Sequence, residues 1–335
     1  MKINFLFLLL SSITSVLGQT VSKPVFVSKA PSRVSVDSVY SYTFLAFDSA
    51  GRALKYDVRE IPSWLTYKKR ERRLYGKPVA IGQYPVSIVA TNGKKETAQR
   101  WMLTVFNKGT KNILTIGNSI TNGTDKYNSY RRALWKKLHD AGFNFDMIGS
   151  WDRHHMGGYV PDPDFDMDHE GHSGWNSADI MDPPAWDSVR GNIKRWLQTY
   201  TPDVVLIELG TNDVFQCRKE EEVIRDLDKL ISMLRSKNSQ VHIFVSNIIP
   251  LGSAWTTKNL CHTKPYGELI GDLNNRLTEW IPRITQPHSP AILVDQFSGL
   301  DPNRHMYDDI HPNTEGEEIM AQRWFDAIRP YMTLK

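Results

Sequence analysis

The sequence predicts two parts of different fold class, a small all-β sandwich followed by an α/β part, a three-layer α/β/α sandwich with a mainly parallel sheet. Short bursts of alternating apolar and polar residues fill positions 23–106, and this is the period of half-buried strands. Beyond position 110, apolar runs of strand length alternate with stretches of helical period, as in a parallel sheet covered by helices. A polar, glycine-containing stretch from Asn107 to Thr110 separates the two patterns. We therefore place the domain boundary after residue 108.

The first 18 residues predict a signal peptide. Lys2 precedes an apolar run over residues 3–10 that is too short to cross a bilayer, and a pattern suited to cleavage ends at Gly18. We expect a secreted, extracellular protein whose mature chain begins at Gln19. The alternative is an uncleaved anchor. No later apolar segment has the length of a membrane span, so we expect no stable span.

Residues 19–108 are expected to form the β-sandwich. Its strands are predicted from side chains of period two, as in Tyr40-x-Tyr42-x-Phe44, Val86-x-Ile88-x-Ala90 and Trp101-x-Leu103-x-Val105. Turn signals such as Asn92-Gly93 stand between the bursts. The charged stretch from Lys68 to Arg73 predicts the solvated end of a hairpin. Contact of this domain with acidic polysaccharide or a cell surface is the alternative for that stretch.

Residues 109–335 are expected to form the α/β domain. Its strands are predicted at apolar runs, namely residues 113–116, 145–148, 204–209, 241–246 and 292–294. Helical spacing of apolar residues predicts one helix through Ile224 to Leu234 and another through Leu269 to Trp280. A Thr314-x-x-Glu317 pattern predicts a capping box at the start of the last helix. Folds of this kind place their functional sites at the carboxyl ends of the strands.

The chain contains two cysteines, Cys217 and Cys261. In a secreted protein such a pair predicts a disulfide, and the alternative is two buried free thiols.

Composition excludes several classes of protein. With 40% hydrophobic and 23% charged residues, the chain is neither disordered nor a coiled coil nor collagen-like. A formal net charge of +4, spread along the chain, does not favour nucleic acid as a partner, since nucleic-acid binding needs clustered basic residues.

Three polar motifs follow strands or precede the last helix of the α/β part. These are Gly117-Asn118-Ser119, Gly210-Thr211-Asn212-Asp213 and Asp308-Asp309-Ile310-His311-Pro312. Taken singly, each motif is an ordinary turn. Together they supply a nucleophile, a polar donor for an oxyanion and a base at one edge of a sheet, which indicates a hydrolase.

These motifs, with Gly174 in Gly171-His172-Ser173-Gly174-Trp175, resemble the four blocks of the SGNH hydrolases, also called GDSL esterases and lipases. The run Asp168 to Trp175 is most similar to carbohydrate esterases that remove acetyl groups from xylan. The pattern of residues 19–108, including Pro62-x-Trp64-Leu65 and Gly82-x-Tyr84, resembles cadherin-like and immunoglobulin-like modules of secreted microbial enzymes.

The resemblance implies a role for each block. Ser119 would be the nucleophile, His311 its general base, and Asp308 the carboxylate that orients the imidazole. The backbone N–H groups of Ser119 and Gly174 and the side-chain amide of Asn212 would donate to the oxyanion, with glycine at 174 allowing close approach. No cofactor is implied.

One residue departs from the family pattern: Asn118 stands where the family usually has Asp. An amide keeps an acceptor oxygen but carries no charge, so the hydrolase domain could alternatively have decayed into a glycan-binding surface protein.

The loop from Trp151 to Trp175 is rich in histidine and aspartate, which raises the alternative of a metal site. Its Asp-x-Asp run lacks the glycine and the final glutamate of a calcium loop, and we expect a hydrogen-bonded polar loop without metal. Among the aromatic residues of the loops, Trp175, Trp255 and Tyr307 are the candidates for binding substrate, and packing within the loops is the alternative.

The sequence thus predicts a secreted serine esterase acting on short acyl esters, notably acetyl groups on an ester-bearing glycan. The alternative within the same fold is a lipase or lysophospholipase, although no long apolar lid segment is present.

Overall fold

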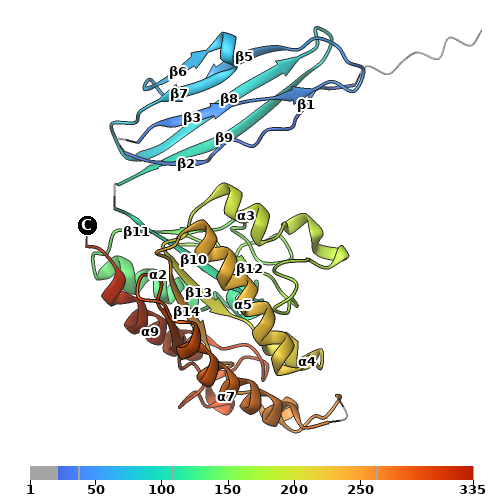
Figure 1. Cartoon of the computed structure of the whole chain (residues 1–335), viewed down its shortest axis with the longest axis vertical. Helices are drawn as coiled ribbons and strands as arrows, with labels where there is room; N and C mark the ends of the chain where they lie inside the picture. The colour runs from blue at the N-terminus through green and yellow to red at the C-terminus, as the bar shows by residue number, and fades with distance from the viewer. Residues whose placement is uncertain (1–21, 37, 108, 262, 335) are drawn as a thin grey trace, which may run out of the picture. The chain divides into compact units, whose positions relative to one another are not determined.

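A computed structural model describes residues 22–36, 38–107, 109–261 and 263–334 (Figure 1). The predicted signal peptide lies outside the described residues. The chain divides into two compact units, and the second begins at Gly109. Each unit is described by itself below.

The N-terminal unit consists of β-strands, as the sequence predicts. A four-stranded sheet has the order β2 (Arg33–Ser35), β9 (Glu96–Phe106), β8 (Gly82–Thr91) and β5 (Lys55–Glu60). A three-stranded sheet has the order β3 (Tyr40–Thr43), β7 (Arg73–Gly76) and β6 (Leu65–Lys68), and β1 (Val25–Phe26) pairs with β4 (Ala46–Phe47). Residues from both larger sheets, among them Tyr42, Leu74, Ile88 and Leu103, share one buried apolar core.

The charged stretch after β6 forms the end of a hairpin. Strands β6 and β7 pair antiparallel, and the 3-10 turn η1 (Lys69–Glu71) joins them. No residue of η1 is buried, and Arg72 closes the turn with a φ of 50°. The prediction of a solvated hairpin end is confirmed.

The C-terminal unit is built on a parallel sheet. Its order is β11 (Phe145–Ile148), β10 (Lys111–Gly117), β13 (Val204–Glu208), β14 (His242–Ser246) and β15 (Ala291–Val294), and each neighbouring pair is parallel. A short strand that the sequence analysis did not predict, β12 (Glu170–Gly171), pairs with the end of β10.

Helices cover both faces of this sheet (Figure 1). Buried residues of α2 (Tyr130–Asp140) and α9 (Thr314–Ile328) pack on one face, with Ile113 and Leu206 of the sheet. Buried residues of α3 (Ile193–Thr199), α5 (Glu220–Lys237) and α7 (Tyr266–Ile284) pack on the other, with Leu114 and Ile207. Because successive residues of β10 and β13 point to opposite faces, these apolar strands contribute side chains to the buried core on each side of the sheet. The predicted three-layer fold is confirmed.

Short helical segments occupy the connections. They are α1 (Ser119–Asn122), η2 (Ala185–Arg190), α4 (Thr211–Phe215), α6 (Ser253–Thr256), α8 (Pro302–His305) and η3 (Arg329–Tyr331). Both α1 and α4 begin directly beyond strands, after β10 and β13, where the fold class places functional residues. Over the described ranges, no helix has both the length and the apolar character that crossing a membrane requires.

Two local predictions have different outcomes. Cys217 and Cys261 form a disulfide, as predicted. The predicted capping box at α9 is wrong, because the N-cap is Asn313, whose side-chain oxygen accepts from the N–H groups of Glu315 and Gly316. The Glu317 carboxylate instead turns inward and accepts from the Ser129 backbone N–H at 2.6 Å.

Candidate active site

Ser119 lies where β10 ends and α1 begins. The turn is tightly packed: a Cβ on Gly117 would lie 2.1 Å from the Thr121 Oγ and 2.8 Å from the Glu208 carbonyl oxygen. Only glycine fits at this position, so the chain can turn from the strand directly into α1. The serine is thereby presented at the carboxyl edge of the sheet.

The structure brings Ser119, His311 and Asp308 together from distant parts of the chain. The His311 Nε2 lies 2.8 Å from the Ser119 Oγ. The His311 Nδ1 lies 2.9 Å and 2.8 Å from the two carboxylate oxygens of Asp308. A carboxylate only accepts, so Nδ1 carries the proton and Nε2 is left to accept from the serine hydroxyl.

The Asp308 carboxylate is held in its charged form. Partial burial opposes ionisation, but hydrogen bonds from the backbone N–H and the imidazole of His311 and from the Ile310 N–H outweigh it and lower the pKa of Asp308. The His311 ring also stacks on Tyr127, with centroids 5.2 Å apart. The imidazole is therefore held from two sides.

The loop that carries the base is anchored at both ends. The Asn313 cap secures it to α9, and the Asn313 N–H donates to the His305 carbonyl at 2.9 Å. Asp309, beside the orienting carboxylate, has a φ of 65°, which is unusual for a residue other than glycine. The Gly252 N–H donates to the Asp309 carbonyl at 2.8 Å, so the loop after β14 supports this turn.

The predicted oxyanion donors lie around the block from Gly171 to Trp175. The His172 N–H donates to the Gly117 carbonyl at 2.8 Å, which holds the block against the nucleophile turn. Within the described part of the chain, no hydrogen bond uses the backbone N–H of Ser119 or Gly174. The Asn212 amide donates to the Trp175 carbonyl at 2.8 Å, and its second hydrogen remains for an oxyanion.

Gly174 has a backbone conformation that favours glycine. Its φ is +82°, and the nearest protein atom to a Cβ built on it would be 3.7 Å away, on Trp186. The close approach of an oxyanion to the Gly174 N–H stays a prediction.

Asn118 supports the nucleophile turn without a charge. Its side chain is fully buried, and its oxygen caps α1 by accepting from the Ile120 N–H at 2.8 Å. The amide nitrogen has no hydrogen-bond partner among the described residues. The cap that a carboxylate could form is thus made by the amide oxygen.

Buried Arg131 of α2 also supports α1, and the sequence analysis missed it. Its guanidinium donates to the carbonyls of Thr121 at 2.7 Å, Asn122 at 3.1 Å and Met167 at 2.8 Å. Thr121 and Asn122 are the last residues of α1, whose free carbonyls are the groups that need donors. In the sequence, Arg131 lies on the helix face of Leu134 and Leu138, and an arginine on such an apolar face could have indicated this role.

The histidine-rich loop forms hydrogen bonds rather than a cluster of metal ligands. The His169 Nδ1 accepts from the Gly171 N–H at 2.8 Å, and Nε2 lies 3.1 Å from the Arg153 carbonyl. Burial, with the nearby Arg131 charge, holds the pKa of His169 well below its usual value, so the ring is neutral. Among the described residues, no group of three potential ligands is arranged to hold a metal ion.

The predicted substrate-binding residues differ in their surroundings. The prediction for Trp175 is wrong: its side chain is fully buried and stacks on His172, and its indole N–H donates to Asp187 at 3.0 Å. Trp255 has the Lys258 ammonium 3.6 Å above its ring. Tyr307 is 52% exposed on the loop that carries His311, and its role stays a prediction.

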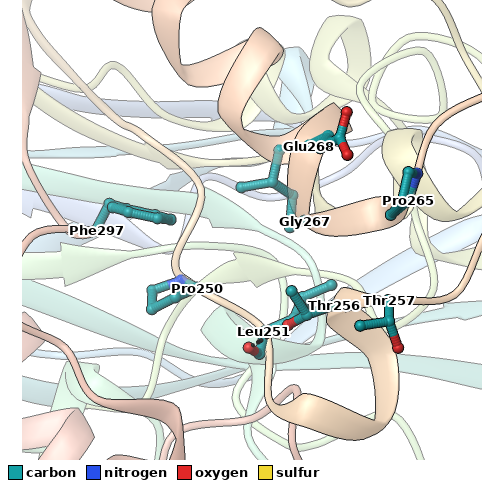
Figure 2. Close-up of a pocket in the computed structure, with 9 residues that line it drawn as sticks. Pro250, Leu251, Thr256, Thr257, Pro265, Gly267, Glu268 and Phe297 are labelled. Atoms are coloured by element: carbon teal, nitrogen blue, oxygen red, sulfur yellow. Dashed lines mark hydrogen bonds between the residues drawn. The ribbon is translucent and has the colours of Figure 1, made fainter.

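A pocket of about 340 Å³ lies beside the loop after β14 (Figure 2). It is lined by Pro250, Leu251, Thr256, Thr257, Pro265, Gly267, Glu268, Ile270 and Phe297. Its Leu251 precedes Gly252, which holds the Asp309 turn, so the pocket adjoins the segment that carries Asp308. The predicted catalytic residues are not among those that line it.

Comparison with known proteins shows which families the two units match. The family described as “GDSL-like Lipase/Acylhydrolase family” matches residues 115–319, and the one described as “Putative Ig domain” matches residues 23–106. A multidomain esterase from Ruminococcus flavefaciens is 29% identical over 238 residues, which are 67% of this chain. This chain spans only 29% of the length of that relative.

Solved structures resemble the C-terminal unit. A family 3 carbohydrate esterase from Talaromyces cellulolyticus is 27% identical, with a TM-score of 0.54, and the match covers 66% of this chain and 98% of that one. An acetyl esterase mutant solved with an acetate ion has the same identity, TM-score and coverage. A family 3 carbohydrate esterase from Clostridium thermocellum, 24% identical with a TM-score of 0.51 over 67% of this chain and all of that one, shares the fold.

Proposed function

The chain belongs to the GDSL-like lipase/acylhydrolase family, and on that premise we propose that it is a secreted esterase that removes acetyl groups from polysaccharides. The observation that carries the proposal is the line of hydrogen bonds from Ser119 through His311 to Asp308. The similarity to family 3 carbohydrate esterases and to an acetyl esterase supports the choice of substrate.

The geometry fits acyl transfer in two steps. As the Ser119 oxygen attacks the ester carbonyl, the His311 Nε2 takes its proton, and the Asp308 carboxylate stabilises the imidazolium. The same nitrogen then returns the proton to the sugar oxygen as its bond to the acyl carbon breaks, and the sugar leaves with a free hydroxyl. Water, activated in turn by His311, releases acetate and restores the serine.

The developing oxyanion would be bound by the N–H groups of Ser119 and Gly174 and by the Asn212 amide. Donors already aimed at the position where charge develops need no rearrangement during the reaction. Before substrate arrives, the Asn212 amide is held by its bond to the Trp175 carbonyl, and the block that contains Gly174 is held by the bond from the His172 N–H to the Gly117 carbonyl.

The test is acetate release from acetylated xylan by the full chain, with Ser119→Ala as the matched control. We expect release by the wild type and a loss on the order of 10⁴- to 10⁶-fold in kcat in the variant, because the serine and its base act as a unit. Comparison of 4-nitrophenyl acetate with the octanoate ester tests the acyl group. Absence of acetate release from glycans, or preference for the octanoate ester, would contradict the proposal.

A further inference from the structure

Trp186 is a large apolar side chain left in solvent beside the candidate oxyanion site. It is 70% exposed. The far edge of its six-membered ring lies 3.7 Å (Cη2) and 4.0 Å (Cζ2) from the position that a Cβ on Gly174 would occupy. The indole therefore borders the residue whose N–H is predicted to bind the oxyanion.

The backbone around Trp186 is held in place although its side chain is not buried. The neighbouring Asp187 accepts from the Trp175 indole N–H at 3.0 Å with one oxygen and from the Arg190 Nε at 3.0 Å with the other. Arg190 also donates to the His155 carbonyl at 3.0 Å and lies 3.5 Å above the Trp151 ring. These contacts fix η2 on the block that contains Gly174. Binding of a ligand at Trp186 therefore costs little backbone entropy in η2.

Other aromatic residues in these loops have partners for their rings. Trp175 is buried, Trp151 is covered by Arg190 and Trp255 by Lys258, and Tyr159 lies 4.7 Å below the Arg153 guanidinium. Among the described residues, no aromatic ring stacks on Trp186 and no cation lies over its ring. Its faces remain available to a ligand.

We propose that Trp186 forms the subsite for the pyranose ring that bears the scissile acetyl group, by packing its indole face on the sugar. This inference rests on the proposed function and names the residue that would favour a sugar ester over an ester without a ring. The apolar face of an indole can pack on the C–H face of a pyranose, and the indole N–H can donate a hydrogen bond to a sugar hydroxyl. A flat indole, rather than a deep apolar pocket, favours a ring over an acyl chain.

The experiment compares two acetyl esters that differ in the ring, peracetylated xylose and triacetin. The measured quantity is the ratio of their kcat/KM values in the full chain. We expect Trp186→Ala to lower this ratio about tenfold, mainly through KM for the xylose ester, and Trp186→Phe to retain most of it. The matched control is Val189→Ala, because Val189 is 83% exposed on the same η2 segment.

An unchanged ratio in Trp186→Ala, or an equal fall in Val189→Ala, would overturn the subsite. The subsite would also be overturned if Trp186→Ala lowered the ratio of kcat/KM for tributyrin to that for triacetin and left the ratio for the xylose ester unchanged. That result would assign Trp186 to binding the acyl chain. Failure of the proposed function is distinguishable, because the wild type would then release no acetate from glycan esters while still cleaving triacetin.

Discussion

Two histidine–carboxylate pairs of the C-terminal unit, His311 with Asp308 and His172 with Glu170, differ in their surroundings. His311 pairs with Asp308 at 2.8 Å, and the two side chains are 17% and 45% exposed. His172 pairs with Glu170 at 3.0 Å, and the two side chains are 1% and 0% exposed. In these two pairs, an imidazole and a carboxylate therefore meet near the surface in one case and in the core in the other.

The surroundings of each imidazole show the difference in role. In the surface pair, the His311 Nε2 faces the Ser119 hydroxyl. In the buried pair, the His172 ring stacks on Trp175 and Trp196, with centroids 4.1 Å and 5.1 Å away. A pair that faces a nucleophile can move a proton, whereas a pair enclosed by aromatic rings holds two segments together.

The buried carboxylate is a junction of donors. One Glu170 oxygen accepts from the Ser150 N–H at 2.6 Å and from the Tyr200 hydroxyl, and the other is bonded to His172. Burial and the neighbouring Glu170 charge raise the pKa of Tyr200 well above its usual value, so the phenol stays protonated and donates. Glu170 thus joins β12, α3 and the segment after β11.

Among the changes that test this comparison, Asp308→Asn in the surface pair is expected to have the largest effect on activity. The Asp308 Oδ1 also accepts from the N–H groups of Ile310 and His311, so the oxygen of an asparagine would keep that position and its NH₂ group would face Nδ1. Because that group donates, the tautomer that leaves Nε2 free is lost. We expect kcat on a short acetyl ester to fall on the order of 10³- to 10⁴-fold, while the melting temperature changes little. A loss of folding instead of activity would show that this pair, too, is structural.

The matched change in the buried pair is Glu170→Gln, and its main effect is expected on stability. An amide offers one acceptor oxygen where Ser150, Tyr200 and His172 now converge, so at least one buried donor loses its partner. We expect the free energy of unfolding to fall by about 2–4 kcal/mol, measured by denaturant titration. Unchanged stability would contradict the role assigned to Glu170.

A smaller loss of activity is expected from Asn212→Ala. Removal of one oxyanion donor should lower kcat about 10²- to 10³-fold and leave KM nearly unchanged. Gln216→Ala is the control, because Gln216 also contacts this segment, through the Gly174 carbonyl at 3.4 Å, without being a predicted donor. Equal losses in the two variants would assign Asn212 to holding the segment rather than to the oxyanion.

A pH-dependent effect on stability is expected from Glu208, a buried carboxyl group without the donors that Glu170 has. Both oxygens are buried without a hydrogen-bond partner among the described residues, and burial raises the pKa of Glu208 from 4.5 to about 8. Between these values the folded state binds more protons than the unfolded state, so stability falls as pH rises. Glu208→Gln should flatten the decline in unfolding free energy from pH 5 to pH 8, and an unchanged slope would contradict this prediction.

The sequence by itself determined the class of both units and the chemistry of the site. The spacing of apolar residues that distinguishes strands from helices depends only on neighbours along the chain. The strands around Ile113, Val204 and Ile243 were therefore predictable. Ser119, Asn212 and His311 stand in short motifs at the ends of elements, where local pattern and chemical type coincide. The disulfide was predicted because the protein is expected to be secreted and its two cysteines allow a single pairing.

Only the tertiary structure decided which of the chemically similar residues face solvent. Trp175 and Trp186 lie in the same irregular stretch, and no local pattern separates the buried ring from the exposed one. Asp308 and Glu170 each precede a histidine closely, yet only Glu170 accepts from Tyr200 of a distant segment, and only its partner His172 stacks on Trp196. Glu317 matched a capping box but bonds Ser129 of a remote loop. Burial and partner choice depend on residues that packing brings together from far along the chain, and a local pattern carries no record of them.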